Sequence, residues 1–403
     1  MQKNLAERGK KVVSPVLGRY FPEFEIEKSK GCHLFGTDGK KYLDFSSGIA
    51  ACSTGYAHPK IVAAAAKQLR KLIHICIGIA NYEPYIVLAE KLSKVVPIKS
   101  AQFFFCQSGS EAVEAAIKLA KYAQKKPGIV ALRGAFHGRT LGALSVTTSK
   151  MKYRDGYEPL LPEVYIVEPV LDEIEKIFAS KSIAAIIIEL IFGEGGYITL
   201  HQEFVQKLRV LCGQYNVLLI VDEVQTGFGR SGKWFACEHY NLVPAILCLA
   251  KGMASGFPLG GIAAGAELMT KWPPGAHGST FGGNPVCCAA GIATVEVIQK
   301  EKLVQNSVKL GAYLKKKLSA LQTKYSQLIK EVRGKGLMLG VDFQDADKVK
   351  KIMNYCLAHG LVLISTGGDG TVIRFIPPLI VTKKQIDAGL KIFEAALNNA
   401  QLH

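Results

Sequence analysis

Two charged residues that directly follow apolar runs could share one catalytic pocket. Asp222 follows the run 217–221, and Lys251 follows the run 244–250. A carboxylate at the end of a buried strand requires a partner or a proton, and an amine in apolar surroundings loses proton affinity and becomes a nucleophile. If the two runs form neighbouring parallel strands, both groups lie at the edge where α/β sheets bind ligands. A purely structural Asp–Lys pair is the alternative.

Polar residues also follow other apolar runs. The stretch 108–111, Ser-Gly-Ser-Glu, has the spacing of a helix capping box. The free N–H groups of such a helix start suit a phosphate, although a helix cap without a ligand explains the pattern equally well. Glu189 and Glu194 follow another buried run, and Arg139 and Arg374 lie near apolar segments. Arginine suits bidentate binding of a carboxylate, but isolated arginines more often form surface ion pairs.

The glycine-rich turn after Asp222 is similar to two nucleotide-binding motifs. The stretch 227–232 matches G-x-G-x-x-G, and with Lys233 it nearly matches a P-loop. Trp234 stands where a P-loop requires Ser or Thr for Mg²⁺, and the ribose-binding acid of a dinucleotide site is missing about twenty residues further on. A P-loop nucleotide-binding protein is therefore only a distant alternative.

Buried runs alternate with helical stretches from about residue 100 to residue 290. This pattern predicts an α/β fold with a mostly parallel central sheet covered by helices. The short mixed strands and helices near the C-terminus indicate a smaller α+β domain. We expect a large domain, 46–300, and a small domain, 301–403. The expected strands of the large sheet are 101–105, 129–132, 164–167, 184–188, 217–221 and 246–249.

The composition of the 403-residue chain is ordinary for a globular protein, but its net charge is +17. The basic residues are interspersed with acids, so we expect no nucleic-acid partner; the charge serves either to attract anionic small molecules or solubility alone. No apolar run is long enough for a membrane span, and no secretory h-region is visible. The ten cysteines form no C-x-x-C pair, and His137 has no second ligand at metal spacing. We expect buried free thiols, no metal and a cytoplasmic location.

Several motifs together resemble the class III pyridoxal-phosphate aminotransferases over nearly the whole chain. The resemblance implies pyridoxal 5′-phosphate as the cofactor and PLP-dependent fold type I, with an N-terminal segment, 1–45, that joins the small domain. It also implies a homodimer with shared active sites, possibly a tetramer. The motifs are Ser108-Gly109-Ser110-Glu111-Ala112, Phe136-His137-Gly138-Arg139-Thr140, Asp222-Glu223-Val224-Gln225-Thr226-Gly227-Phe228-Gly229-Arg230, Ala250-Lys251-Gly252 with Pro258-Leu259-Gly260-Gly261, and Gly278-Ser279-Thr280-Phe281-Gly282-Gly283-Asn284-Pro285.

The same resemblance implies roles at the cofactor. Lys251 would hold the cofactor covalently and shuttle a proton, and Asp222 would keep its pyridine nitrogen protonated. Gln225 would bond the ring 3-oxygen, and Phe136 would stack on the ring with Val224 behind it. The other implied cofactor-binding residues are Gly109 and Ser110 at the phosphate, His137, Glu189, and Thr280, which would reach the phosphate of the neighbouring subunit.

Within the class, the chain is most similar to 4-aminobutyrate aminotransferases. This similarity implies that the amine of 4-aminobutyrate, or another ω-amino acid, passes to 2-oxoglutarate, giving a semialdehyde and glutamate. Arg139 would meet the distal carboxylate of the substrate, and Arg374 would meet an α-carboxylate. Glu194 would pair with Arg374 when an ω-amine is bound, and Ile49 would line the apolar wall.

One segment departs from the family pattern. Leu190 and Phe192 stand where the family usually has Pro and Gln. This departure leaves an acetylornithine or ornithine aminotransferase of arginine metabolism as the alternative. A racemase or aminomutase on the same fold is a further alternative, and it would need no oxo-acid acceptor.

Overall fold

A seven-stranded mixed sheet lies at the centre of the larger part of the molecule. The computed structural model describes residues 5–402, so the first four residues and the last residue of the expected domains lie outside it. Six of the seven strands run parallel, and β12 pairs antiparallel with both of its neighbours. The predicted mostly parallel sheet is therefore confirmed. In sheet order the strands are β4 (Ala101–Cys106), β12 (Gly260–Gly265), β11 (Ile246–Leu249), β10 (Leu218–Asp222), β7 (Ile183–Ile188), β5 (Gly128–Leu132) and β6 (Val164–Val167).

The antiparallel strand β12 is the one member of this sheet that the sequence did not predict. Its residues, Gly-Gly-Ile-Ala-Ala-Gly, include few of the β-branched and aromatic types that are enriched in strands. Small residues are needed here because the backbone is crowded. A Cβ atom on Gly261 would lie 2.5 Å from the carbonyl oxygen of Phe104 on β4.

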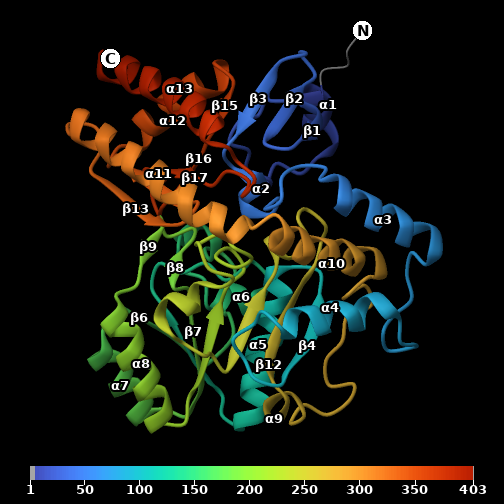
Figure 1. Cartoon of the computed structure of the whole chain (residues 1–403). Helices are drawn as coiled ribbons and strands as arrows, with labels where there is room; N and C mark the ends of the chain where they lie inside the picture. Colours follow the sequence, from blue (N-terminus) through green and yellow to red (C-terminus); the bar gives the residue numbers. More distant parts are fainter. Residues whose placement is uncertain (1–4, 403) are drawn as a thin grey trace.

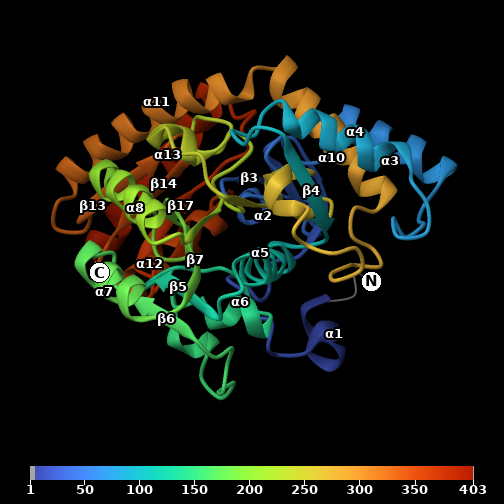
Figure 2. The same ribbon diagram turned by 90° about the horizontal axis from the view of Figure 1, so that it is seen from below.

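Helices cover the central sheet and cross above it. Helix α5 packs against β11 and β12, and α8 packs against β10. Figure 1 shows α10 and α11 crossing the middle of the view, with the large sheet below them and β1–β3, α12 and α13 above. Figure 2 shows the same helices from below. The helices are α1 (Leu5–Val12), α2 (Ser47–Ala50), α3 (Pro59–Lys71), α4 (Glu83–Ser93), α5 (Gly109–Gln124), α6 (Leu141–Ser145), α7 (Leu171–Ser180), α8 (Gln202–Gln214), α9 (Ala266–Met269), α10 (Pro285–Lys300), α11 (Leu303–Lys324), α12 (Ala346–Ala358) and α13 (Lys383–Leu402).

Three strands from the N-terminal part of the chain and one from its C-terminal part form a small sheet, of order β1-β2-β3-β15. Strands β2 and β3 form an antiparallel hairpin, and β15 pairs in parallel with β3, placing Leu361 beside Leu43. A second four-stranded sheet has the order β13-β14-β17-β16. The domain boundaries near residues 45 and 300 stay a prediction. The remaining strands are β1 (Ile26–Lys30), β2 (His33–Gly36), β3 (Lys41–Asp44), β8 (Ile191–Phe192), β9 (Ile198–Thr199), β13 (Glu331–Lys335), β14 (Met338–Asp342), β15 (Leu361–Val362), β16 (Ile364–Thr366) and β17 (Val372–Phe375).

The glycine-rich turn 227–232 is buried and packs against C-terminal segments, so it cannot bind a nucleotide. All six residues are buried. The Arg230 guanidinium donates to the carbonyl oxygens of Leu337, at 3.0 Å, and Pro377, at 2.5 Å. Gly336, with a φ of +57°, approaches so closely that its Cβ would lie 2.4 Å from the Ser231 carbonyl carbon. This packing excludes the P-loop alternative.

The ten cysteines are free thiols, and most are buried, as predicted. Within residues 5–402, no helix is both long and apolar enough to cross a membrane.

Candidate active site

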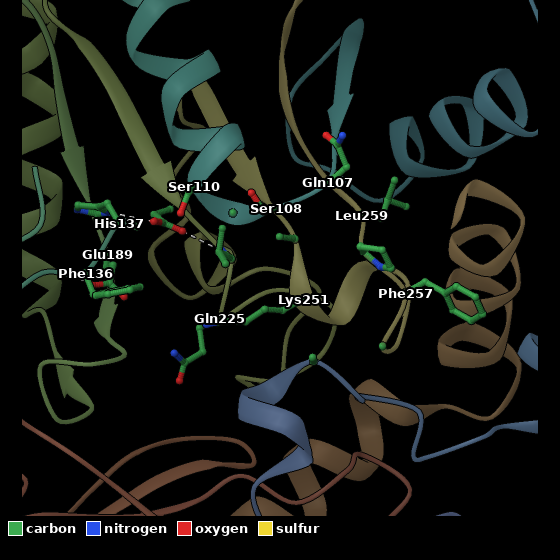
Figure 3. A pocket seen from close by; sticks show the side chains of 18 residues that line it. Gln107, Ser108, Ser110, Phe136, His137, Glu189, Gln225, Lys251, Phe257 and Leu259 are labelled. Carbon is green, nitrogen blue, oxygen red and sulfur yellow. Dashed lines mark hydrogen bonds and ion pairs between the residues drawn. The ribbon is translucent and has the colours of Figure 1, made fainter. Parts of the chain in front are cut away.

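Asp222 and Lys251 lie at the ends of neighbouring parallel strands, as the sequence predicted. Asp222 is the last residue of β10 and pairs with Cys248 on β11. Lys251 follows β11 and begins a short 3₁₀ turn, Lys251–Met253. Both residues line a cavity of about 400 Å³. Figure 3 shows the Lys251 side chain extending across this cavity toward Gln225.

Lys251 has a strained backbone conformation. Its φ is +46°, in the left-handed region that non-glycine residues rarely adopt. Such strain persists only where the surrounding structure enforces it, and it is concentrated at functional sites. Burial lowers the pKa of Lys251, and the nearby carboxylates of Glu194 and Asp222 only partly oppose that shift. A larger share of the amine is therefore neutral, and so nucleophilic, than in an exposed lysine.

The partner of Asp222 is His137, and not Lys251. The Asp222 Oδ2 atom lies 2.8 Å from Nδ1 of His137, and Oδ1 accepts a hydrogen bond from the Val224 N–H at 2.9 Å. Within the described range, Asp222 and Lys251 form no ion pair, so the alternative of a structural Asp–Lys pair is wrong. Both members of the His137–Asp222 pair are buried. The separation of 85 residues hid this contact from sequence analysis.

Glu189 holds two backbone segments at the cavity wall. Its carboxylate accepts hydrogen bonds from the N–H groups of Phe136, at 2.8 Å, and Gly193, at 3.0 Å. Burial raises the pKa of Glu189 to about 7; the nearby carboxylate of Asp222 adds to this rise and His137 opposes it. The protonated form of this carboxyl is therefore favoured more than in an exposed glutamate.

Half of the predicted capping box at the start of α5 is present, because Glu111 bonds the N–H of Gln107 and not that of the N-cap residue Ser108. Ser108 Oγ accepts a hydrogen bond from the Glu111 N–H at 3.3 Å, and Glu111 Oε2 accepts one from the Gln107 N–H at 3.0 Å. Gly109 and Ser110 form the first turn and line the cavity. A Cβ atom on Gly109 would lie 2.8 Å from a methyl group of Val224, so only glycine leaves this turn open.

Arg374 and Glu194 form a buried ion pair beside this cavity. The Arg374 Nη1 atom lies 2.5 Å from Glu194 Oε1, and its Nη2 donates to the Tyr20 hydroxyl at 2.8 Å and to the Ser365 carbonyl oxygen at 2.8 Å. Burial alone would raise the pKa of Glu194, but Arg374 and Lys251 outweigh burial and hold it below its usual value. Glu194 is thus an anion that neutralises Arg374. Sequence reasoning missed Tyr20, because a single tyrosine 354 residues from its partner carries no local signal.

The expected cofactor-binding residues of this chain meet in the cavity, except for Thr280, which is exposed and lies elsewhere. The expected substrate residues do not line this cavity. Arg139 is exposed, and its guanidinium carbon lies 4.7 Å from the ring centre of Tyr153. Ile49 is 38% exposed. The cavity is lined by Ala51, Gln107, Ser108, Gly109, Ser110, Phe136, His137, Gly138, Glu189, Asp222, Val224, Gln225, Ala250, Lys251, Gly256, Phe257, Pro258 and Leu259.

The departure from the family pattern lies behind the cavity wall. Leu190 and Phe192 are both buried in the apolar core, and neither lines the cavity. Phe192 belongs to the short strand β8, which pairs with β9. A neighbouring residue that the sequence did not single out, Tyr197, donates to Oε1 of Gln225 at 2.9 Å and so fixes the orientation of that amide.

The chain belongs to the class III aminotransferases, because the family model described as "Aminotransferase class-III" matches residues 17–397. It is 43% identical to an acetylornithine aminotransferase of Archaeoglobus fulgidus, over 91% of this chain and 94% of that protein. It is 38% identical to a 5-aminovalerate aminotransferase of Pseudomonas aeruginosa, with 96% of each chain covered. A 4-aminobutyrate aminotransferase of Escherichia coli is 36% identical, with 99% of each covered.

The fold is also that of solved aminotransferases. The ornithine aminotransferase of Toxoplasma gondii superposes with a TM-score of 0.92 at 26% identity, covering 100% of this chain and 95% of that one. Class III aminotransferases use pyridoxal 5′-phosphate, and this chain is therefore a PLP-dependent aminotransferase of fold type I. Both the resemblance of the motifs and the expected cofactor are confirmed.

The observed cavity fits that cofactor. Its volume lies within the usual range for small-molecule sites. At one wall, the open first turn of α5 offers a place for a phosphate. The half-buried Lys251 amine, for which the described residues provide no hydrogen bond, and the buried Asp222 carboxylate project from adjacent strands. Within residues 5–402, no group of His, Cys, Asp or Glu is arranged to hold a metal ion.

Proposed function

We propose that this enzyme transfers the primary amine of an ω-amino acid with a distal carboxylate to 2-oxoglutarate. The pairing of Arg374 with Glu194 carries the proposal. Because Glu194 neutralises Arg374, a carboxylate on the donor's reacting carbon would find no free cation at this position. A donor that reacts through a –CH₂–NH₂ group has no such carboxylate and therefore suits the site. Arg139 is exposed and has no ion pair among the described residues, so it is available for a carboxylate at the far end of the donor.

We assign each residue of the cavity a separate role in the amine transfer. When bound, pyridoxal phosphate supplies an aldehyde carbon and a ring that accepts electrons from the donor carbon. Lys251 would hold the aldehyde carbon and could move a proton at the donor's reacting carbon. Asp222, oriented by His137, would keep the ring nitrogen protonated. The first turn of α5 would hold the phosphate.

The other residues at the ring orient the cofactor. Phe136 and Val224, which both line the cavity, would hold the two faces of the ring, and Gln225 would bond the ring oxygen. Glu189 accepts the Phe136 N–H and so holds that ring in place. Ile49 contributes an apolar wall to the substrate side of the site.

The identity of the donor is a choice between two related molecules. The sequence motifs favoured 4-aminobutyrate, but the relatives support N-acetylornithine at least as well. Each carries a primary amine at one end and a carboxylate at the other. Comparing kcat/KM for N-acetylornithine, 4-aminobutyrate and 5-aminovalerate, each with 2-oxoglutarate, ranks the donors. Turnover of none of them, or racemisation of an amino acid without an oxo acid, would refute the proposed reaction.

The proposed role of Lys251 has its own test. Lys251→Ala should abolish turnover and the visible absorbance that arises when the cofactor is bound covalently to the lysine. Lys271→Ala, at a lysine outside the cavity, is the matched control and should retain both. Turnover by the Lys251→Ala protein above about 1% of the parent rate would contradict the assignment.

We also propose a homodimer with shared active sites, without choosing between a dimer and a tetramer. The support is the position of Thr280, which is exposed and lies outside the cavity of its own chain, next to Phe281, which is 56% exposed. Mixing inactive Lys251→Ala subunits with Thr280→Ala subunits tests this proposal. A shared site predicts that mixed dimers contain one site with both native residues, so that activity rises after subunit exchange. No rise despite exchange would refute sharing.

A further inference from the structure

Two aromatic rings frame the guanidinium group of Arg139. Its central carbon lies 4.7 Å from the ring centre of Tyr153 and 5.7 Å from that of Phe136. The two rings contact each other edge to face, with centres 5.7 Å apart and planes at 71°. Because the π face of an aromatic ring attracts a cation, Tyr153 restricts the positions that this exposed guanidinium can occupy.

Both ends of helix α6 are held in a way that fixes this contact. At its start, directly after Arg139, the Glu114 Oε1 atom accepts hydrogen bonds from the Thr140 hydroxyl at 2.6 Å and the Gly142 N–H at 3.0 Å. Beyond its other end, the Arg154 guanidinium donates to the Ser145 carbonyl oxygen at 2.8 Å. The five-residue helix therefore holds the neighbours of both Arg139 and Tyr153 in fixed positions.

The Tyr153 hydroxyl stays protonated in its surroundings, so its contact with Arg139 is that of a neutral ring with a cation. Burial and the negative charge of Glu194 raise the pKa of Tyr153, and Arg139 only partly opposes this rise. The ring therefore remains a neutral phenol near pH 7. Tyr153 thus lies within the electrostatic influence of Glu194, while its face contacts Arg139.

We propose that Tyr153 is a positioning residue that aims Arg139 at the distal carboxylate of the donor and so sets the preference for carboxylate-bearing donors. The proposal rests on the proposed function, in which Arg139 meets that carboxylate. Tyr153 need not touch the substrate, because the preference arises from the restricted orientation of the arginine.

The test uses the holoenzyme and a pair of donors that differ only in the carboxylate. Single-turnover loss of the cofactor's visible absorbance is followed with 4-aminobutyrate and with n-butylamine, and the ratio of the two second-order rate constants gives the carboxylate preference. The variants are Tyr153→Leu, Tyr153→Phe and Arg139→Ala. Tyr157→Leu is the matched control, because Tyr157 lies four residues further along and is 54% exposed.

Tyr153→Leu should lower the carboxylate preference about three- to tenfold, the range of a partly shielded cation–π contact, through a weaker apparent affinity for 4-aminobutyrate. Tyr153→Phe keeps the ring and should restore the preference to within about twofold. Tyr157→Leu should change nothing. Equal losses for both amines, or a loss in Tyr153→Phe as large as in Tyr153→Leu, would overturn the proposal.

Arg139→Ala separates this inference from the proposed function. If Arg139→Ala abolishes the preference but Tyr153→Leu leaves it intact, the positioning role of Tyr153 is refuted and the proposed role of Arg139 stands. If Arg139→Ala also leaves the preference intact, the distal-carboxylate role of Arg139 fails, and the inference about Tyr153 fails with it.

Discussion

Glu223 is a fully buried carboxyl group for which residues 5–402 provide no ion pair. It accepts hydrogen bonds from the Cys237 N–H, at 2.8 Å, and from the Thr226 hydroxyl. Burial nevertheless raises its pKa from 4.5 to about 7. Between these two values, the folded protein binds a proton that the unfolded chain has lost. Folding stability therefore falls as the pH rises from about 4.5 to 7, and it is not regained above that range.

Replacement of Glu223 by glutamine should remove this pH-dependent loss. Glutamine has nearly the same shape and carries no charge at any pH. Its oxygen can accept the Cys237 N–H, and its NH₂ group can donate to the Thr226 hydroxyl oxygen in place of the bond that this hydroxyl donates to Glu223. A shift from 4.5 to about 7 corresponds to about 3 kcal/mol in total, of which about 2–3 kcal/mol falls between pH 5 and pH 8. Relative to the parent, Glu223→Gln should thus gain about 2–3 kcal/mol of stability at pH 8 compared with pH 5.

Urea unfolding of the holoenzyme at pH 5 and pH 8 measures this difference, because effects of pH on all other groups cancel between the variant and the parent. The matched control is Glu203→Gln, at an exposed glutamate paired with Lys207. That change should alter the pH dependence little. A Glu223→Gln advantage that stays constant or shrinks from pH 5 to pH 8 would show that the buried carboxyl does not bind a proton in this range.

Three further substitutions test the site. His137→Leu removes the hydrogen bond to Asp222 and should raise the dissociation constant of pyridoxal phosphate about tenfold, measured by titration of the apoenzyme; an unchanged constant would contradict the role of the pair. Gly109→Ala should weaken cofactor binding, because its Cβ would meet a valine methyl at 2.8 Å, whereas Gly213→Ala, with nothing within 4 Å, should leave binding unchanged. Glu194→Gln should lower kcat/KM for ω-amine donors and raise it for glutamate, because the buried arginine then lacks its carboxylate; equal effects on both donors would refute this reasoning.

The cofactor end of the site and the pairing of Arg374 with Glu194 were predictable from sequence, but the tyrosine and histidine contacts were not. Asp222 ends one strand and Lys251 follows shortly after another, and both strands are apolar over four consecutive residues; such local patterns indicate both the strand and its end. The pairing of Asp222 with His137 has no local signal, because it depends on how β10 and the turn after β5 meet in space. The contact of Tyr20 with Arg374 spans 354 residues and has no local signal either. Arg139 and Tyr153 lie on opposite sides of α6 in the sequence, so their contact also depends on the fold.

Glycine has a different cause in the missed strand β12 and in the rejected nucleotide motif. In β12, two backbones approach closely, and a Cβ on Gly261 would meet the backbone of β4. In the motif, Gly229 and Gly232 each have a φ of +90°, a conformation that side chains rarely adopt, and neither needs to bind a phosphate. A sequence shows that a side chain is missing, but only the fold shows what occupies the space.

The parallel pairing of β3 with β15 has a consequence for folding during translation. Leu43 is synthesised more than 300 residues before Leu361, its partner in the sheet. At typical translation rates, β3 therefore spends on the order of tens of seconds as an unprotected sheet edge. All strands of the central sheet, which ends at Gly265, emerge before that partner. In a chain that terminates before β15, β3 would remain an unpaired edge strand. We expect such fragments to aggregate, even though they contain Lys251.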